Sequence, residues 1–414
     1  MTGLPLEGVR VADFTWVAMG PMTTRYLADF GARVLRIESE TRPDTMRTSP
    51  PFRDKVPGPN RSGAFAYWNA GKESIALNLK SPEGRHLARR LVLEWADVVV
   101  ENFTAGVMEG WDLGYEALAK EKPGLVMLSL STFGRRNHLS SQPGYGPLLT
   151  PLVGVTHLTG WPDRAPVCPG PFGAYLDFVL PRMAAFAVLS ALDHQARTGR
   201  GAYLDISQFE ASLQMVAPPV MAMADDGVEA NRAGYHDPDM VPHGVYPCRR
   251  ERDAALGEEA WIAIAVENEV QWRALKDAMG NPLWAEDPRF ETVSERTACE
   301  EELDQRLSKW TRRYTARRLM VRLQRAGIPC GVVHSNRSLF SDAQLKHRGH
   351  FPTVRGPEIG EHRVDVPESL LSLTPHRIQR SAPLLGEHTY EVCREILGLV
   401  DMEIAKLMEK GVLR

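Results

Sequence analysis

The pentapeptide Gly-Ala-Tyr-Leu-Asp occurs twice in this chain of 414 residues, once ending at Asp177 and once at Asp205. A carboxylate that loses its hydration shell becomes more basic and can attack an activated carbonyl carbon to form a covalent intermediate. Asp177 is followed by the apolar residues 178–180 and by Pro181, which suits the start of a helix. Such a helix would favour the ionised carboxylate with its positive end. Asp177 is therefore a candidate nucleophile, although these residues alone better fit a helix-capping aspartate.

The second aspartate has different surroundings. Asp205 follows a Thr-Gly-Arg-Gly turn and lies in an alternating pattern typical of a strand that enters a helix. We interpret Asp205 as a hydrogen-bonding residue of the scaffold, so the repeat does not indicate two carboxylates that work together.

Several common catalytic motifs are absent from the sequence. The turn after the first apolar run, Thr-Trp-Val-Ala-Met-Gly-Pro, lacks the glycine pattern of a dinucleotide site, and no Walker loop occurs elsewhere. There is no Gly-x-Ser-x-Gly and no His-Glu-x-x-His, and the twelve histidines are dispersed. Nucleotide-cofactor, serine-hydrolase and metal sites are therefore not predicted.

The elements that would position Asp177 alternate between strands and helices. Apolar runs predict buried strands at 9–14, 33–38, 73–79, 97–102 and 124–131, and helical patterns predict helices at 21–32 and 81–96, with Ser81 as N-cap. This order favours a mostly parallel sheet covered by helices.

The rest of the chain indicates a second unit. Residues 215–245 are rich in Pro, Gly and Asp and predict an irregular linker. A strand at 260–266 follows, then helices at 268–280 and 315–327, and two amphipathic helices are predicted within 385–413.

Composition and charge exclude several classes of protein. Hydrophobic residues at 43%, charged residues at 24% and a net charge of -3 describe a soluble globular chain with no expected nucleic-acid or membrane partner. The five cysteines form no Cys-x-x-Cys pair, the N-terminus lacks a signal-peptide pattern, and the apolar run 183–192 is too short to span a bilayer. We therefore expect a cytoplasmic protein.

Several unusual motifs occur in a characteristic order. They include FTWVAMGP, GKESIALNLKSPEG, ENFTAG, LDFVLPRMAAFAVLSAL, AGIPCGVV and SAPLLGEH. Together they resemble the family III CoA-transferases (the CaiB/BaiF, carnitine and formyl-CoA transferase group) along nearly the whole chain. The resemblance implies an α/β fold with a Rossmann-like large domain and a smaller α/β domain, in a ring-shaped chain that forms an interlocked dimer.

The resemblance also suggests domain boundaries. The N-terminal part of the large domain would cover residues 1–215, and the linker 216–245. The small domain would cover residues 246–335, and residues 336–414 would form a second linker and complete the large domain.

For the chemistry, the resemblance implies transfer of CoA from a donor acyl-CoA, such as succinyl-CoA, to an organic acid. Asp177 matches the nucleophile, which forms a mixed anhydride with the acyl group and then an aspartyl-CoA thioester; with the resemblance, this role is favoured over helix capping. CoA thioesters would be substrates, and no permanently bound cofactor is expected. The partner would be an identical chain or a related subunit.

The positions that match CoA contacts of the family lie in turns. They are Val17, Ala18, Met19, Leu77, Lys80, Asn102, Phe103, Thr104 and Tyr145. The formyl-CoA transferases carry polar or basic residues where Ala18, Ser39, Gly110 and Pro143 stand here. Other basic residues would then have to hold the CoA phosphates, and the candidates are Arg36, Arg47, Lys72, Arg135 and Arg136.

Substrate size and two alternative functions stay open at this point. The glycine-rich loop of the formyl-CoA transferases is absent from 220–260, which disfavours oxalate, and Trp16 hints at a larger or aromatic acid. One alternative is an α-methylacyl-CoA racemase, but that reaction needs a histidine base where Tyr145 stands, and a neutral phenol is a poor replacement. The other alternative is a non-catalytic subunit of a heteromeric CoA-transferase.

Overall fold

The computed structural model describes residues 3–251, 259–376, 378 and 380–414, and its chain divides into two compact units. Unit 1 comprises residues 1–156, 168–230 and 344–414, and unit 2 comprises 157–167 and 231–343. The chain thus passes between the units near 230 and 343, whereas the sequence suggested 215, 245 and 335. The short excursion of 157–167 into unit 2 was not predicted.

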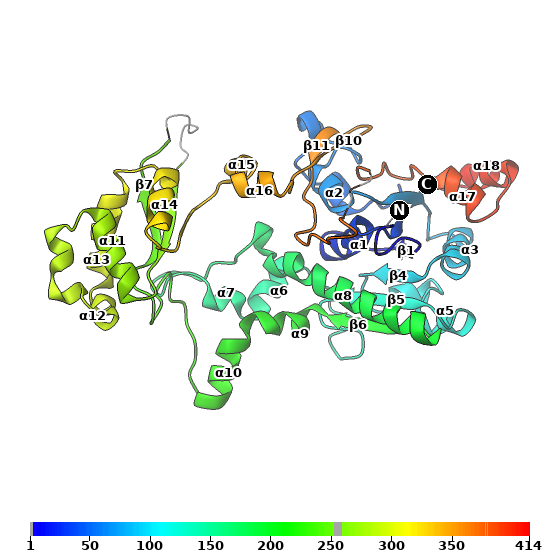
Figure 1. The fold of residues 1–414 in the computed structure, drawn as a ribbon. Helices are drawn as coiled ribbons and strands as arrows, with labels where there is room; N and C mark the ends of the chain where they lie inside the picture. The colour runs from blue at the N-terminus through cyan, green and yellow to red at the C-terminus, as the bar shows by residue number, and fades with distance from the viewer. Residues whose placement is uncertain (1–2, 252–258, 377, 379) are drawn as a thin grey trace. The chain divides into compact units, whose positions relative to one another are not determined.

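Unit 1 contains a six-stranded parallel sheet in the order β3-β2-β1-β4-β5-β6 (Figure 1). Strands β1–β5 are buried on both faces, as expected for a parallel sheet covered by helices, and the edge strand β6 is only partly buried. The order of the strands along the chain changes direction between β1 and β4. This position is the switch point of the sheet, where ligands bind in open sheets of this type. All five predicted buried strands are confirmed, with bounds β1 Arg10–Asp13, β2 Arg33–Glu38, β3 Glu73–Ala76, β4 Val98–Glu101 and β5 Val126–Ser131; β6 is Tyr203–Ser207.

Helices connect these strands. In α3 the predicted N-cap is confirmed, because the Ser81 hydroxyl accepts a hydrogen bond from Gly84 N at 2.9 Å. The helices of unit 1 that connect or flank the strands are α1 Met19–Asp29, α2 Gly63–Trp68, α3 Pro82–Arg90, α4 Val107–Gly110, α5 Tyr115–Glu121, α6 Gly146–Leu152, α8 Tyr175–Thr198 and α9 Gln208–Ser212.

Helix α8 starts earlier than the sequence suggested. It begins at Tyr175, so Asp177 lies within its first turn rather than ahead of it, and Pro181 lies inside the helix. Proline has no N–H, so Pro181 leaves the Asp177 carbonyl without the usual helical donor. By length and composition α8 could cross a membrane, but it packs against α1, α6 and β5 of unit 1.

The segment predicted to be an irregular linker is partly helical. Residues Ala217–Asp226 form helix α10, with Pro218 at the start of the helix, where its missing N–H costs nothing. Strand β7 already begins at His243. The prediction of an irregular linker at 216–245 is therefore wrong for 217–226 and 243–245, whereas residues 227–242 form no helix or strand.

The C-terminal helices belong to the core of unit 1. Val392, Cys393, Leu397 and Ile404 are buried in the same cluster as Leu35 and other residues of the N-terminal strands. The two predicted amphipathic helices are α17 Thr389–Glu395 and α18 Asp401–Glu409, and the preceding hairpin is β10 Thr353–Gly356 with β11 Gly360–Arg363.

Unit 2 has its own core, in which Trp272, Leu275, Leu303 and Leu319 pack behind a three-stranded antiparallel sheet. Figure 1 shows α11–α14 gathered beside β7. The sheet consists of β7 His243–Cys248, β8 Ala260–Ala265 and β9 Cys330–Val332. The helices are α11 Glu269–Met279, α12 Val293–Ala298, α13 Glu300–Thr311, α14 Ala316–Arg325 and α15 Asn336–Leu339; α7 Val155–Leu158 and α16 Ala343–His347 lie where the chain changes units.

Candidate active site

The candidate residues of unit 1 lie at the carboxyl edge of its parallel sheet. Helix α8 ends beside the start of β5, where Gly201 N donates to the Pro123 carbonyl at 2.8 Å. Its first turn, with Asp177, therefore lies at the opposite, carboxyl edge. The turns after β1, β3 and β4 meet the same edge, and these turns carry most of the predicted CoA contacts.

Asp177 is a buried carboxylate. Only 8% of the residue is exposed, and burial raises its pKa to about 6. Among the described residues, no cation or hydrogen-bond donor counteracts this effect of burial. The group is thus ionised at pH 7 yet poorly solvated, which is the state in which a carboxylate is most nucleophilic.

The first turn of α6 lies directly against this carboxylate. Gly146, the first residue of α6, leaves so little room that a methyl group in place of its hydrogen would lie 2.3 Å from Asp177 Oδ2. Tyr145, the residue before it, caps α6 and exposes 66% of its surface. The structure therefore brings Tyr145 and Asp177 to the same place on unit 1.

Asp205 has a structural role, as the sequence predicted. It is exposed on β6, and both of its carboxylate oxygens accept a hydrogen bond from the Arg135 N–H at 3.0 Å. These hydrogen bonds hold the turn after β5 in place.

The turns after β1 and β4 hold one another. Asn102 accepts from Trp16 N and donates to the Trp16 carbonyl, both at 2.8 Å. The Phe103 ring meets Trp16 edge-on, with centroids 5.9 Å apart. Val17 has a left-handed backbone, φ 66°, and its N–H points to the Asp44 carboxylate at 3.2 Å. The predicted contacts 17–19 and 102–104 are thus brought together at the switch point of the sheet.

The other predicted contacts differ in accessibility. Ala18 and Met19 are buried, and Met19 is tied to α9 by a hydrogen bond from Gln208 Nε2 to its sulfur at 2.6 Å. Lys80 and Thr104 are exposed. The Leu77 side chain is fully buried in the core.

Most of the basic residues considered for the phosphates are internal. Arg36 and Arg47 are fully buried, with Arg36 2.5 Å from Asp44 and Arg47 2.6 Å from Glu38. Lys72 is buried 3.0 Å from Asp13, and Arg135 pairs with Glu101. Burial lowers the pKa of Lys72 to about 8, against the opposing effect of Asp13. These four cations neutralise carboxylates at the ends of β1, β2 and β4, so they are not available to phosphates.

Two further arginines, in the loops after β5 and β2, are exposed. Arg136 is exposed, with its guanidinium 6.0 Å from the Tyr203 ring. Arg42 is exposed and lies over the Trp16 ring at 5.1 Å, and within the described part of the chain no carboxylate pairs with it. Sequence reasoning missed Arg42; the signal that could have found it is its place in the loop after β2, at the same edge.

We compared the sequence with models of known protein families, and the result agrees with the fold, the buried Asp177 carboxylate and the turns at the switch point. The model described as CoA-transferase family III matches residues 6–389. The chain belongs to CoA-transferase family III.

Curated members of family III are similar over their full length. The succinyl-CoA–D-citramalate CoA-transferase of Chloroflexus aurantiacus is 32% identical over 412 residues, 99% of this chain and 98% of its own. The alpha subunit of the succinyl-CoA–L-malate CoA-transferase of the same organism is 31% identical over 414 residues, 99% of this chain and 93% of its own. Such enzymes take CoA thioesters as substrates, and this chain is a CoA-transferase of the same family.

A solved family structure has the same fold. The crystal structure of a CaiB/BaiF family protein from Brucella suis superposes with a TM-score of 0.85 at 30% identity, covering 95% of this chain and 100% of that chain. The mixed α/β fold with a parallel six-stranded sheet is therefore shared with this family III protein.

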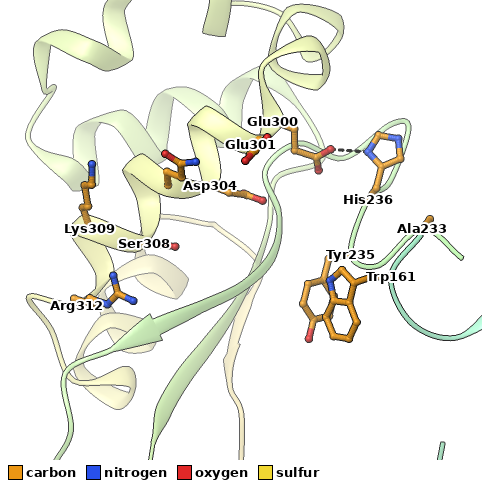
Figure 2. Close-up of a pocket in the computed structure, with 11 residues that line it drawn as sticks. Trp161, Ala233, Tyr235, His236, Glu300, Glu301, Asp304, Ser308, Lys309 and Arg312 are labelled. Atoms are coloured by element: carbon orange, nitrogen blue, oxygen red, sulfur yellow. Dashed lines mark hydrogen bonds and ion pairs between the residues drawn. The ribbon is translucent and has the colours of Figure 1, made fainter. Parts of the chain in front are cut away.

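Unit 2 contains a separate cavity of about 530 Å³ (Figure 2). Trp161 and Tyr235 meet edge-on on one side, with centroids 5.7 Å apart, and His236 Nδ1 lies 2.6 Å from Glu300 of α13. None of the residues predicted to bind CoA or to react lines this cavity.

Proposed function

We propose that this CoA-transferase moves CoA from succinyl-CoA to a small dicarboxylic acid, with Asp177 as covalent nucleophile. The observation that carries the proposal is the buried Asp177 carboxylate, whose pKa burial raises to about 6, at the carboxyl edge of the sheet. An aspartate that only capped a helix would gain nothing from such burial.

The proposed reaction balances in four steps. Asp177 attacks the thioester carbonyl of succinyl-CoA, the C–S bond breaks, and the CoA thiolate departs as the leaving group. The product on the enzyme is an aspartyl-succinyl anhydride. The thiolate then attacks the aspartyl carbonyl and expels succinate, which gives the aspartyl-CoA thioester. The acceptor carboxylate displaces the thiolate to form a second anhydride, and the thiolate attacks the acceptor's acyl carbon to release the new CoA thioester and free Asp177.

The choice of substrates follows the named relatives. Their names specify succinyl-CoA with citramalate or malate, which supports a succinyl donor and a C4 or C5 dicarboxylate acceptor here. The larger or aromatic acid suggested by Trp16 remains a prediction. Trp16 is half-buried between Phe103 and Arg42, so its ring is engaged on two sides before any acyl group enters.

The proposed CoA site runs along the switch point. The turn Val17–Met19 and residues 102–104 would border the CoA arm, with Lys80 and Tyr145 at its ends. Since Arg36, Arg47, Lys72 and Arg135 are paired internally, we assign the phosphates to Arg42 and Arg136. One guanidinium group can donate two parallel hydrogen bonds to two phosphate oxygens, so arginine suits this role.

Trapping of the covalent intermediate tests the function. The chain is incubated with succinyl-CoA, hydroxylamine is added, and the modified residue is located by peptide mass. We expect a hydroxamate at Asp177 that is lost in Asp177→Asn, and an unchanged adduct in the matched variant Asp205→Asn. An adduct elsewhere, or no adduct with active donor, would remove Asp177 from the mechanism.

A heteromer is the second arrangement that a relative supports, because the L-malate enzyme is built with a named alpha subunit. If this chain were a non-catalytic partner, the purified chain alone would show neither transfer nor an adduct. Transfer by the pure chain, abolished in Asp177→Asn, would exclude that arrangement.

The proposed assembly is a dimer of ring-shaped, interlocked chains in the cytoplasm. Support comes from α10, where Val220, Met221 and Met223 each expose half or more of their surface and, within the described chain, no residue of the helix is buried. An apolar helix of this kind is typical of a protein interface.

The cytoplasmic location is proposed from the cysteines. All five are free thiols, as a reducing compartment would keep them.

A further inference from the structure

The glycine at position 146 has an unusual environment. A methyl group built on Gly146 would lie 2.3 Å from Asp177 Oδ2, 2.8 Å from Asp177 Cγ and 2.4 Å from the Ala174 methyl carbon. Carbon atoms in proteins essentially never approach other heavy atoms this closely, so an alanine here would have to displace the carboxylate, Ala174 or the start of α6.

A left-handed backbone does not explain why this residue is a glycine. Gly146 is the first residue of α6 and is not among the described glycines with positive φ. In a helix, alanine is favoured over glycine by about 1 kcal/mol. Helix propensity alone would therefore favour alanine. Two features oppose it: Pro147, which follows and disfavours a helical conformation for a preceding residue with a Cβ, and the space occupied by the Asp177 carboxylate and the Ala174 methyl group.

The preceding glycine shows that the whole segment is tightly enclosed. A methyl group on Gly144 would lie 2.0 Å from the Thr132 hydroxyl oxygen, just beyond the end of β5. The segment Gly144–Gly146 thus passes between Thr132 and Asp177. At each of the two positions a glycine avoids the overlap that a side chain would cause.

We propose that Gly146 is a positioning residue for Asp177: its missing side chain lets the carboxylate lie flat against the first turn of α6, buried and aimed for attack. This inference rests on the proposed function of Asp177. A misplacement of a reacting group by about 1 Å can cost roughly 100-fold in rate, so a single methyl group at this position is expected to matter.

The test compares Gly146→Ala with Gly63→Ala. Gly63 is also the first residue of a helix, and its added methyl group would meet Pro51 only at 3.4 Å, an ordinary contact. The rate at which a carbodiimide and an amine label Asp177, located by peptide mass, reports the exposure of the carboxylate without any need for activity. We expect faster labelling in Gly146→Ala, because the carboxylate is pushed from its buried position, and an unchanged rate in Gly63→Ala.

Kinetics give a second readout. Gly146→Ala should lower kcat for CoA transfer by roughly 100-fold, with little change in KM for the donor. The acid limb of its pH profile should move to lower pH, because a displaced carboxylate is better solvated. Labelling and a pH limb equal to those of the unmodified chain would overturn the proposal.

A double-variant comparison separates the carboxylate from Ala174. If the overlap with Asp177 is what excludes a side chain, Gly146→Ala should lower Tm less in an Asp177→Ala background than in the unmodified chain. An equal loss of Tm in both backgrounds, or failure of both Gly146→Ala proteins to fold, would assign the glycine to Ala174 instead and overturn the proposal. Should the unmodified chain prove inactive, the proposed function fails, while labelling and Tm still decide the role of Gly146.

Discussion

The two aspartates of the repeated pentapeptide show how far the environment decides the chemistry of one side chain. Asp205 is exposed and accepts two hydrogen bonds from the Arg135 N–H, so its charge is solvated and stabilised. Asp177 is buried beside Gly146 and receives no comparable support in the described structure. The two carboxylates therefore differ in solvation, and only Asp177 has the desolvated state that the proposed role as nucleophile requires.

The burial of Asp177 predicts a measurable cost in stability. Its pKa rises from 3.8 to about 6 on folding, so the folded state binds the proton more tightly between these pH values. The free energy of unfolding therefore falls as pH rises from 4 to 6 and stays lower above that range. Asp177→Asn should be more stable than the unmodified chain at pH 7.5 by about 1–3 kcal/mol, and no more stable at pH 4. Urea unfolding at both pH values checks this.

In the same experiment Asp205→Asn serves as control, because it removes a solvated, hydrogen-bonded carboxylate and should bring no gain. Equal stability of Asp177→Asn and the unmodified chain at pH 7.5 would mean that Asp177 is not desolvated.

At the scale of elements, the carboxyl edge of the sheet is held by buried ion pairs. Lys72 Nζ donates to Asp13 Oδ2 at 3.0 Å, to the Pro21 carbonyl at 2.8 Å and to Asn69 Oδ1 at 2.9 Å. It thereby fastens the end of β1 to the start of α1. The turn that presents Val17–Met19 leaves from this point, so the ion pair positions the proposed CoA site from inside.

Removal of one member of this pair should be costly. Lys72→Met leaves Asp13 buried without its cation and should destabilise the chain by about 3–5 kcal/mol. Lys120→Met, at an exposed position of α5, should change stability by less than about 0.5 kcal/mol. Thermal unfolding of both variants tests this difference in stability. A small effect of Lys72→Met would show that the Lys72–Asp13 ion pair is not essential to the stability of the carboxyl edge of the sheet.

The cap of α3 gives a smaller effect. Ser81→Ala removes the acceptor of the Gly84 N–H, 2.9 Å away, and should lower the free energy of unfolding by about 1 kcal/mol. Ser81→Asp keeps an acceptor and should retain the stability. Denaturant midpoints of the two variants decide; equal losses in both would mean that the hydroxyl does more than cap the helix.

The sequence could predict elements whose pattern is local. The parallel strands and the Ser81 cap follow from apolar runs and from a residue type at a fixed offset, and both are present. Helix α10 could not be recognised, since prolines at its start look like helix breakers until the first turn is seen. The roles of Arg47 and Lys72 could not be predicted either, because their partners Glu38 and Asp13 belong to β2 and β1 and only the fold brings them together. Arg36 pairs with Glu38 of its own strand and with Asp44 of the next loop, but its burial also depends on the fold. Asp177 itself follows from family resemblance, whereas its close contact with Gly146 of α6, 31 residues earlier in the sequence (177 − 146), depends on the fold.

At the scale of the whole molecule, the exposed face of α10 bears on assembly. Met221 exposes 53% of its surface, and Val220 and Met223 beside it are similarly exposed. If this face forms the proposed dimer interface, Met221→Glu should weaken self-association, because a buried interface cannot accommodate an unpaired charge. Sedimentation of this variant against Met402→Glu, an exposed methionine on α18, tests the prediction. An unchanged dimer in Met221→Glu would place the interface elsewhere.

Unit 1 is built from segments at both ends of the chain, and this has a consequence for its biosynthesis. Its core includes Val392 and Ile404, and Asn78 N donates to the Val412 carbonyl at 2.8 Å, so the N-terminal strands are completed by residues synthesised more than 300 positions later. Unit 2, whose main segment 231–343 is translated earlier than these helices, can close its own core first. On the ribosome, unit 1 of this CoA-transferase can therefore complete its core only after unit 2 has been translated, and its apolar sheet needs protection from aggregation until α17 and α18 emerge.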